Sequence, residues 1–252
     1  MKIALIQPEA LRSKEALWML LALAAADCAG ESCLVWRPEA KMETEFPAGN
    51  VVREENDRYI SASDALLAKL SFGRSGREIF DTCGERYRDG KIVLLQKSLR
   101  GEEIWESVLP DSAGRLLSCA SEAFDGWIAD FARERGTAWR CAAETADVIL
   151  LCVPAERETF AEARERYRTV REKVVYVFFC EDPREEALAE KLCDENGIGP
   201  ERSIVWRGAE RQLYRGSAAG ERNHLLNEET DSAERKLLET VWEKACGVCR
   251  KF

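Results

Sequence analysis

The sequence contains a single histidine, His224, and no apolar run long enough to cross a membrane. Structural zinc sites are built mainly from Cys and His ligands, so one histidine speaks against them. Acidic residues outnumber basic ones, 46 to 37, and the net charge of −9 argues against a nucleic-acid groove, which needs clustered and uncompensated Lys and Arg. We therefore expect no zinc site, no integral membrane segment and no nucleic-acid partner.

Cysteine is plentiful, with ten residues, but most of these lie in or beside apolar runs, where a thiol acts as a small hydrophobic group. Only Cys246 and Cys249 have the C-x-x-C spacing, and no second pair accompanies them. This spacing alone predicts neither a metal site nor a redox site. Met1 and Lys2 lead directly into an apolar stretch without a signal-peptide pattern, so we expect a cytoplasmic chain.

The chain alternates short apolar strands with longer helices. With 252 residues, 46% of them hydrophobic, it can bury a large core. Strands that alternate with helices of about ten or more residues predict a mostly parallel sheet covered on both faces, which is a three-layer α/β sandwich. No internal repeat or linker is visible, so we expect one domain over residues 1–252. The predicted strands are 2–6, 32–36, 91–96, 126–131, 147–153, 173–180 and 203–206, with a short one at 51–52; the predicted helices are 17–26, 61–70, 77–87, 112–123, 157–171, 184–195 and 232–245.

The first strand and the first helix are joined by a short connection that begins at Gln7-Pro8. A strand, a tight connection and a helix can present helix N-terminal amides to a phosphate group. Residues 9–13 contain no glycine, however, and Glu9 and Glu15 place carboxylates on both sides of Lys14. The frame of a nucleotide-binding fold is therefore expected without its phosphate cradle.

The order of the segments resembles the ParA/MinD-like (SIMIBI) branch of the P-loop NTPases, which includes the TadZ/CpaE-type proteins of pilus assembly. The resemblance covers almost the whole chain and implies the P-loop NTPase fold. Six segments carry it: residues 2–8 resemble the first strand, 63–67 the serine-aspartate-leucine helix, 124–130 the strand that ends in an aspartate, 136–137 the switch glycine and threonine, 146–150 the strand after them, and 227–245 the closing helix.

The phosphate-binding loop departs from the family's pattern K-G-G-x-G-K-[ST]. Here the segment reads Glu-Ala-Leu-Arg-Ser-Lys-Glu, and only Lys14 is retained. Glycines let backbone amides approach a phosphate closely, whereas Ala10, Leu11 and Ser13 add Cβ atoms at those positions. The residue after the lysine should offer a hydroxyl to Mg²⁺, but Glu15 carries a charge that repels phosphate. Glu9 likewise inverts the charge of the family's signature lysine, which reaches across a nucleotide-bridged dimer.

Other positions that the resemblance assigns to nucleotide chemistry also differ. The two aspartates implied at the end of the second strand are Val35 and Arg37, and the base-contacting asparagine is Cys180. Asp130 is the one acidic residue that remains in place.

The resemblance leaves Ser13, Lys14, Asp130 and Gly136 as remnant cofactor-binding positions, with no catalytic or metal-binding residue assigned. The first connection and Asp130 each have a structural alternative. Ser13 can cap the first helix, or that helix can begin at Pro8. Asp130 can be a metal-side carboxylate or can cap its strand, and we favour the cap.

The sequence predicts a non-catalytic, cofactor-free scaffold or localisation protein of the ParA/MinD-like type, a pseudo-ATPase with a degenerate Walker A loop. By resemblance, its setting is Tad-type pilus or secretion assembly, with protein partners, a homodimer as one arrangement, and recruitment to the membrane or cell pole through partners. The alternative is a divergent ATPase that binds ATP with Mg²⁺ through Lys14 and Asp130. An apolar stripe that includes Leu238 and Trp242 on the last helix could seek a membrane or pack on the sheet, and we favour packing.

Overall fold

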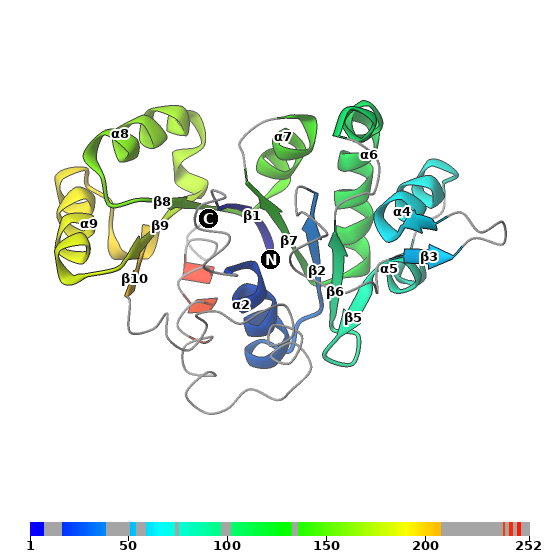
Figure 1. Ribbon diagram of the computed structural model, residues 1–252. Coiled ribbons are helices and arrows are strands. Elements are labelled where there is room, and N and C mark those ends of the chain that lie inside the picture. Colours follow the sequence, from blue (N-terminus) through cyan, green and yellow to red (C-terminus); the bar gives the residue numbers. More distant parts are fainter. Residues whose placement is uncertain are drawn as a thin grey trace.

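The structure is a computed structural model that describes residues 1–7, 17–38, 51–53, 59–73, 76–96, 102–132, 136–207, 239, 242–243 and 246–247. Its core is an eight-stranded sheet with the order β10-β9-β8-β1-β7-β2-β6-β5 (Figure 1). Every neighbouring pair is parallel except β5 and β6, which are antiparallel. The strands are β1 (Lys2–Ile6), β2 (Cys33–Arg37), β5 (Glu85–Tyr87), β6 (Ile92–Gln96), β7 (Gly126–Phe131), β8 (Val148–Val153), β9 (Val174–Cys180) and β10 (Ser203–Arg207).

Helices cover both faces of this sheet, which confirms the predicted three-layer arrangement. One face carries α2 (Leu17–Leu23), which continues as the π-helical turn η1 (Ala24–Cys28). Six of the described helices pack on the other face, and Figure 1 shows α4, α6, α7 and α8 above the sheet and α2 below it. They are α4 (Ala62–Ser71), α5 (Arg77–Cys83), α6 (Glu102–Ala123), α7 (Gly136–Thr145), α8 (Arg157–Arg166) and α9 (Pro183–Glu195).

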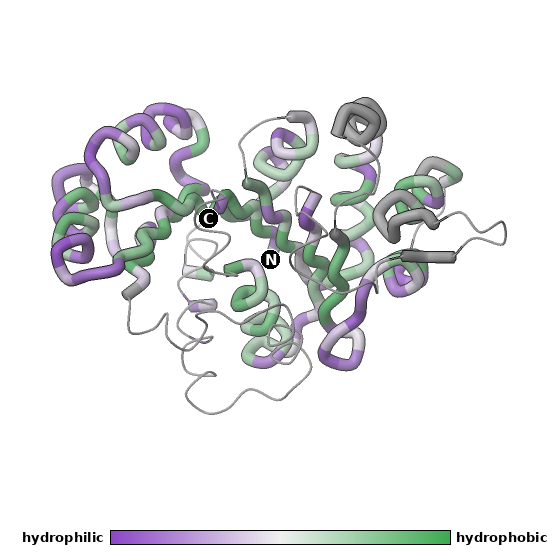
Figure 2. The backbone as a smooth tube through the Cα atoms, viewed as in Figure 1, coloured by the Kyte–Doolittle hydropathy of each residue, from purple (hydrophilic) through white to green (hydrophobic). Residues whose placement is uncertain are grey.

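The central strands are apolar on both sides because both sides are covered. Successive residues of β7 alternate between the two cores: Trp127 packs with the six helices and Ile128 packs with α2. Figure 2 shows the apolar central strands as a green band along the middle of the sheet, with purple residues on the outer helices. Trp242 is half-buried against the α2-side core, as expected if the last helix packs on the sheet. Within the described part of the chain, no helix combines the length and apolarity that a membrane span requires.

The predicted helix 77–87 is wrong in its second half. The helix α5 ends at Cys83, and residues 85–87 form β5 against β6. At Gly84 the backbone is extended, and a Cβ atom there would lie 2.3 Å from Cγ1 of Val93, so the chain approaches β6 at a glycine. A turn with positive φ at Arg88, Asp89 and Gly90 then leads into β6.

Three further boundaries differ from prediction, the first being the start of α6, at Glu102 rather than at residue 112. The expected loop at Gly136-Thr137 is the start of α7, an amphipathic helix that buries Ala138, Trp139 and Ala142. The predicted helix 157–171 ends at Arg166 and is followed by the 3₁₀ helix η2 (Arg168–Lys173). The short strand at 51–52 is confirmed as β3 (Val51–Arg53), which pairs with β4 (Tyr59–Ser61) in a separate two-stranded sheet.

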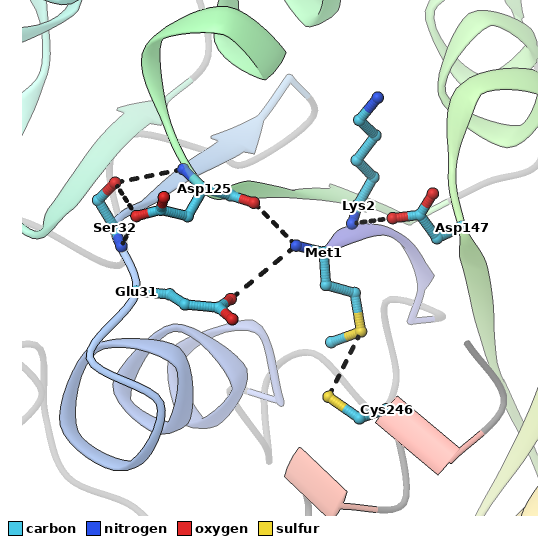
Figure 3. Close-up of polar contacts among 7 residues, drawn as sticks. All are labelled: Met1, Lys2, Glu31, Ser32, Asp125, Asp147 and Cys246. Atoms are coloured by element: carbon cyan, nitrogen blue, oxygen red, sulfur yellow. Dashed lines mark hydrogen bonds and ion pairs between the residues drawn. The ribbon is translucent and has the colours of Figure 1, made fainter. Parts of the chain in front are cut away.

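Polar contacts fix the amino-terminal end of β1 between its two neighbours (Figure 3). The Met1 amine donates to the carbonyl oxygen of Asp125 at 2.9 Å, and the Lys2 backbone N–H donates to Oδ2 of Asp147 at 2.8 Å. Asp125 also accepts from the backbone N–H and the hydroxyl of Ser32. A Cβ atom on Gly126 would lie 2.2 Å from the Met1 carbonyl oxygen, so only glycine fits this close approach. These contacts set the register that aligns the strands at their opposite, carboxyl ends.

Candidate functional site

The carboxyl ends of β1, β7 and β2 lie side by side, at the edge where open parallel α/β sheets bind their ligands. In the register of β7, Asp130 lies opposite Leu5 of β1, and Ala129 lies opposite Trp36 of β2. Arg37 follows Trp36, so Arg37 and Asp130 occupy neighbouring positions on the same face of the sheet. That face is the one covered by α2.

Arg37 and Asp130 form a buried ion pair. The Arg37 Nε donates to Oδ2 of Asp130 at 3.0 Å, and the two side chains are only 2% and 0% exposed. A hydrogen bond between a guanidinium and a carboxylate is short and strong because both groups are charged. The Arg37 Cζ also lies 4.6 Å from the centre of the Trp18 ring on α2, within cation–π range. The guanidinium therefore contacts both the sheet and α2, the helix that follows the first connection.

Aromatic rings pack behind this ion pair on the opposite face of the sheet. Trp36 and Phe131 meet edge to face with ring centres 5.9 Å apart, and Phe131 meets Trp139 of α7 at 5.4 Å. Trp139 in turn contacts Tyr167, at 6.3 Å. Such edge-to-face contacts add to the burial of the rings and fix their orientation. The ends of β2 and β7 are therefore held from both faces.

The four remnant positions are placed unequally. Ser13 and Lys14 lie outside the described residues. Asp130 lies within the sheet, and Gly136 is the first residue of α7, with a positive φ of 83°. The described side-chain partner of Asp130 is Arg37, a contact that neither sequence interpretation, metal-side carboxylate or strand cap, included.

The sequence interpretation noted Arg37 as a reversed charge but missed its pairing with Asp130. The signal was present, because Arg37 and Asp130 close two predicted strands and carry opposite charges. Parallel neighbours bring their carboxyl ends to one edge, so an acid and a base at these ends can pair. What the sequence could not supply was the strand order, which makes β2 and β7 direct neighbours.

Solved structures share this architecture over nearly the whole chain. A ParA family ATPase from Chlorobium tepidum matches with 14% identity and a TM-score of 0.62, covering 97% of this chain and 98% of its own. The cell division ATPase MinD of Pyrococcus furiosus matches with 14% identity and a TM-score of 0.57, covering 96% and 97%. The fold is that of the ParA/MinD ATPases.

A putative plasmid partition protein from Borrelia burgdorferi bound to AMPPNP shares the ParA/MinD fold with this chain at 11% identity and a TM-score of 0.50, covering 96% of this chain and 97% of its own. No protein-family model matches the sequence, and no curated protein is similar to it. Likeness at such low identity establishes the fold and leaves the activity to be argued from the site.

The ParA/MinD fold raises the question of ATP and Mg²⁺, and the residues at Asp130 do not fit the metal ion. Magnesium requires oxygen ligands at about 2.0–2.1 Å in octahedral geometry. Here a guanidinium donates to Asp130 at 3.0 Å, and a second cation beside it would be repelled. Among the residues that the structure describes, no group of three or more His, Cys, Asp or Glu is placed to hold a metal ion. Asp130 is therefore paired with a cation of the chain itself, the guanidinium of Arg37.

Proposed function

We propose that this chain is a ParA/MinD-like protein that works without a nucleotide, as a scaffold or localisation protein. The observation that carries the proposal is the buried ion pair between Arg37 and Asp130. A metal-side carboxylate is one of the two roles considered for Asp130 under the resemblance, and Arg37 supplies a positive charge at that point as part of the chain itself. A cation that is part of the chain neither arrives with ATP nor leaves after hydrolysis, so its presence cannot depend on whether ATP is bound.

The sequence of the first connection supports the same proposal. Lys14 is flanked by Glu9 and Glu15, and the segment 9–15 has no glycine to bring backbone amides against a phosphate. Both the metal side and the phosphate side of a nucleotide site are thus altered.

By resemblance to the TadZ/CpaE-type proteins, we place this function in Tad-type pilus or secretion assembly. Docking to protein partners would mark an assembly site, and partners would bring a cytoplasmic chain to the membrane or cell pole. A homodimer whose two copies meet directly at the carboxyl edge of the sheet, without a nucleotide between them, is compatible with this role.

Calorimetry with millimolar ATP and Mg²⁺ tests the proposal. The Borrelia burgdorferi partition protein, whose structure holds AMPPNP, serves as the positive control. We expect no Mg²⁺-dependent saturable binding to this chain. Saturable binding of Mg²⁺-ATP that is lost in Lys14→Ala would place a nucleotide at the first connection and overturn the proposal.

The alternative function is a divergent ATPase that uses Lys14 and Asp130. It is favoured by the retention of these two residue types at positions that match the family. A phosphate-release assay separates the two functions: turnover that disappears in both Lys14→Ala and Asp130→Asn would establish the enzyme. The scaffold proposal predicts no turnover above background in the parent chain.

A further inference from the structure

A cavity of about 530 Å³ lies at the edge of the sheet opposite to the one that holds Asp130. It is bounded by α8, η2, the start of β9 and the turn after α9, all near the amino ends of β9 and β10. Among the described residues, four arginines and one carboxylate, that of Glu165, line it. Because the whole chain has a net charge of −9, this local excess of positive charge runs against the average surface. The polar residues that matter are Arg164, Arg168, Arg171, Arg202, Tyr176 and Asn196.

Two of these arginines are half-buried and held in place by neutral groups. Arg164 donates to Oδ1 of Asn196, whose own amide is oriented by a 2.7 Å bond to the carbonyl oxygen of Leu192. Arg202 donates to the backbone carbonyl oxygens of Arg171 and Val174. Neither guanidinium meets a carboxylate in the described part of the chain, so their positions are fixed while their charges stay unneutralised.

The other two arginines stand at the exposed rim of the cavity. Arg168 lies 3.6 Å from Glu165, with both side chains about three-quarters exposed (73% and 74%), and such surface pairs are weak. Arg171 has no carboxylate partner among the residues described. Both rim side chains can therefore turn toward an anion at little cost.

Tyr176, on β9, gives the cavity a neutral hydroxyl donor. The side chain is 3% exposed and lines the cavity. Burial raises the pKa of Tyr176, with Arg164 and Arg202 acting in the opposite direction, so the phenol stays protonated at neutral pH. A protonated hydroxyl among guanidinium groups can donate to an anion.

We propose that this cavity binds a small molecule that carries phosphate groups. Arginine recognises phosphate through paired N–H donors, and fixed guanidinium groups lose little freedom on binding. The volume falls within the range of about 300–1,000 Å³ that small-molecule pockets occupy. An acidic peptide is less well matched, because a buried phenol and a bounded cavity suit a compact ligand better than an extended chain.

The cavity is independent of the proposed absence of nucleotide at the first connection. Tyr176 lies near the amino end of β9, whereas Asp130 lies near the carboxyl end of β7, so the two sites occupy opposite edges of a parallel sheet. Variants of the cavity and of Lys14 therefore report on different places.

Calorimetric titration of pyrophosphate into the full chain, in low salt without Mg²⁺, tests the proposal. We expect saturable one-to-one binding that weakens at least about tenfold in Arg171→Gln and in Arg168→Gln, because each loses a charged hydrogen-bond donor. These rim arginines support no backbone group with their side chains, so both variants should keep the parent melting temperature. The matched control is Arg86→Gln, an exposed arginine on β5 at the opposite end of the strand order, which should bind as the parent does.

Each remaining outcome contradicts the proposal. Binding that Arg168→Gln and Arg171→Gln leave unchanged, or no saturable binding at millimolar pyrophosphate, would show that the cavity is not a phosphate site. Binding lost in Lys14→Ala would move the ligand to the first connection. A glutamate-rich peptide that binds more tightly than pyrophosphate would identify an acidic protein segment as the occupant instead.

Discussion

Removing the charge of Arg37 should destabilise the protein more than removing both charges of its ion pair. In Arg37→Met the side chain stays unbranched but loses the guanidinium, and Asp130 is left as a buried carboxylate that is 0% exposed. Breaking a buried pair from one side costs about 3–5 kcal/mol. Since domains are stable by only about 5–15 kcal/mol, this is a large fraction of the total.

Asp130→Asn should cost about 1.5–3 kcal/mol, because the charged guanidinium of Arg37 is then left with a neutral amide oxygen as its acceptor. The double variant contains neither charge, and its remaining cost is that of a poorly paired buried amide, about 1–3 kcal/mol. We therefore expect the Asp130→Asn change to raise the free energy of unfolding when it is added to Arg37→Met. The sign of this effect is opposite to that in the parent chain.

Urea unfolding at pH 7, followed by circular dichroism, measures these differences as shifts of the midpoint at constant slope. Arg157→Met is the matched control: its partner Glu195 lies 2.8 Å away, but the two side chains are 57% and 39% exposed, so the midpoint should barely move. If the costs of Arg37→Met and Asp130→Asn simply add, the two groups do not interact and the case for a resident cation fails.

Three other predictions follow from the described geometry. Gly126→Ala should lower the free energy of unfolding by about 1–3 kcal/mol, because its Cβ atom would lie 2.2 Å from the Met1 carbonyl oxygen. The control is Gly114→Ala in α6, where the atom nearest to the new Cβ lies at 3.9 Å. In thermal melts this control should be neutral or stabilising. Burial raises the pKa of Cys33 to about 12, so native protein at pH 8 should not be alkylated there by iodoacetamide, as mass spectrometry of tryptic peptides can check. Backbone N–H donors at the start of α9 hold the pKa of Asp182 below its usual 3.8. Asp182→Ala should therefore lower the free energy of unfolding at pH 7, and this loss should disappear as the pH falls below about 4 and the carboxylate is protonated. A difference between the variant and the parent that persists at pH 2 would refute the cap.

The sequence was sufficient for the architecture because the strands are apolar on both faces and the helices are long. Buried strands such as β8 and β9 have no polar alternation, which is typical of a parallel sheet between two helical layers. The sequence failed where short-range signals were ambiguous. A single glycine, Gly84, separates the helix from residues 85–87, and the pairing with β6 makes these residues a strand.

The candidate site was predictable in its residue types but not in its contacts. Asp130 and Arg37 were both recognised as strand-end residues, one retained and one reversed in charge. Their pairing depends on β2 and β7 being neighbours, and Trp18 completes it from a helix whose rotation the sequence does not give. The arginine cavity was invisible for a related reason: its arginines come from α8, η2 and the turn before β10, and lie up to 38 positions apart.

The two edges of the sheet have opposite electrostatic designs. At the carboxyl edge, the positive charge of Arg37 is already matched by Asp130 and covered by Trp18, so an anionic ligand would find no free cation in that pair. At the amino edge, Arg164 and Arg202 are oriented by neutral oxygens, which leaves their charge available. If a phosphorylated ligand regulates this protein, it should therefore act through β9 and β10 rather than through β1. Addition of pyrophosphate should then protect the backbone amides of α8, η2 and α9 from hydrogen exchange while those of β1 and α2 keep their parent rates. Protection that centred on α2 would instead show that pyrophosphate binds at the carboxyl edge of the sheet.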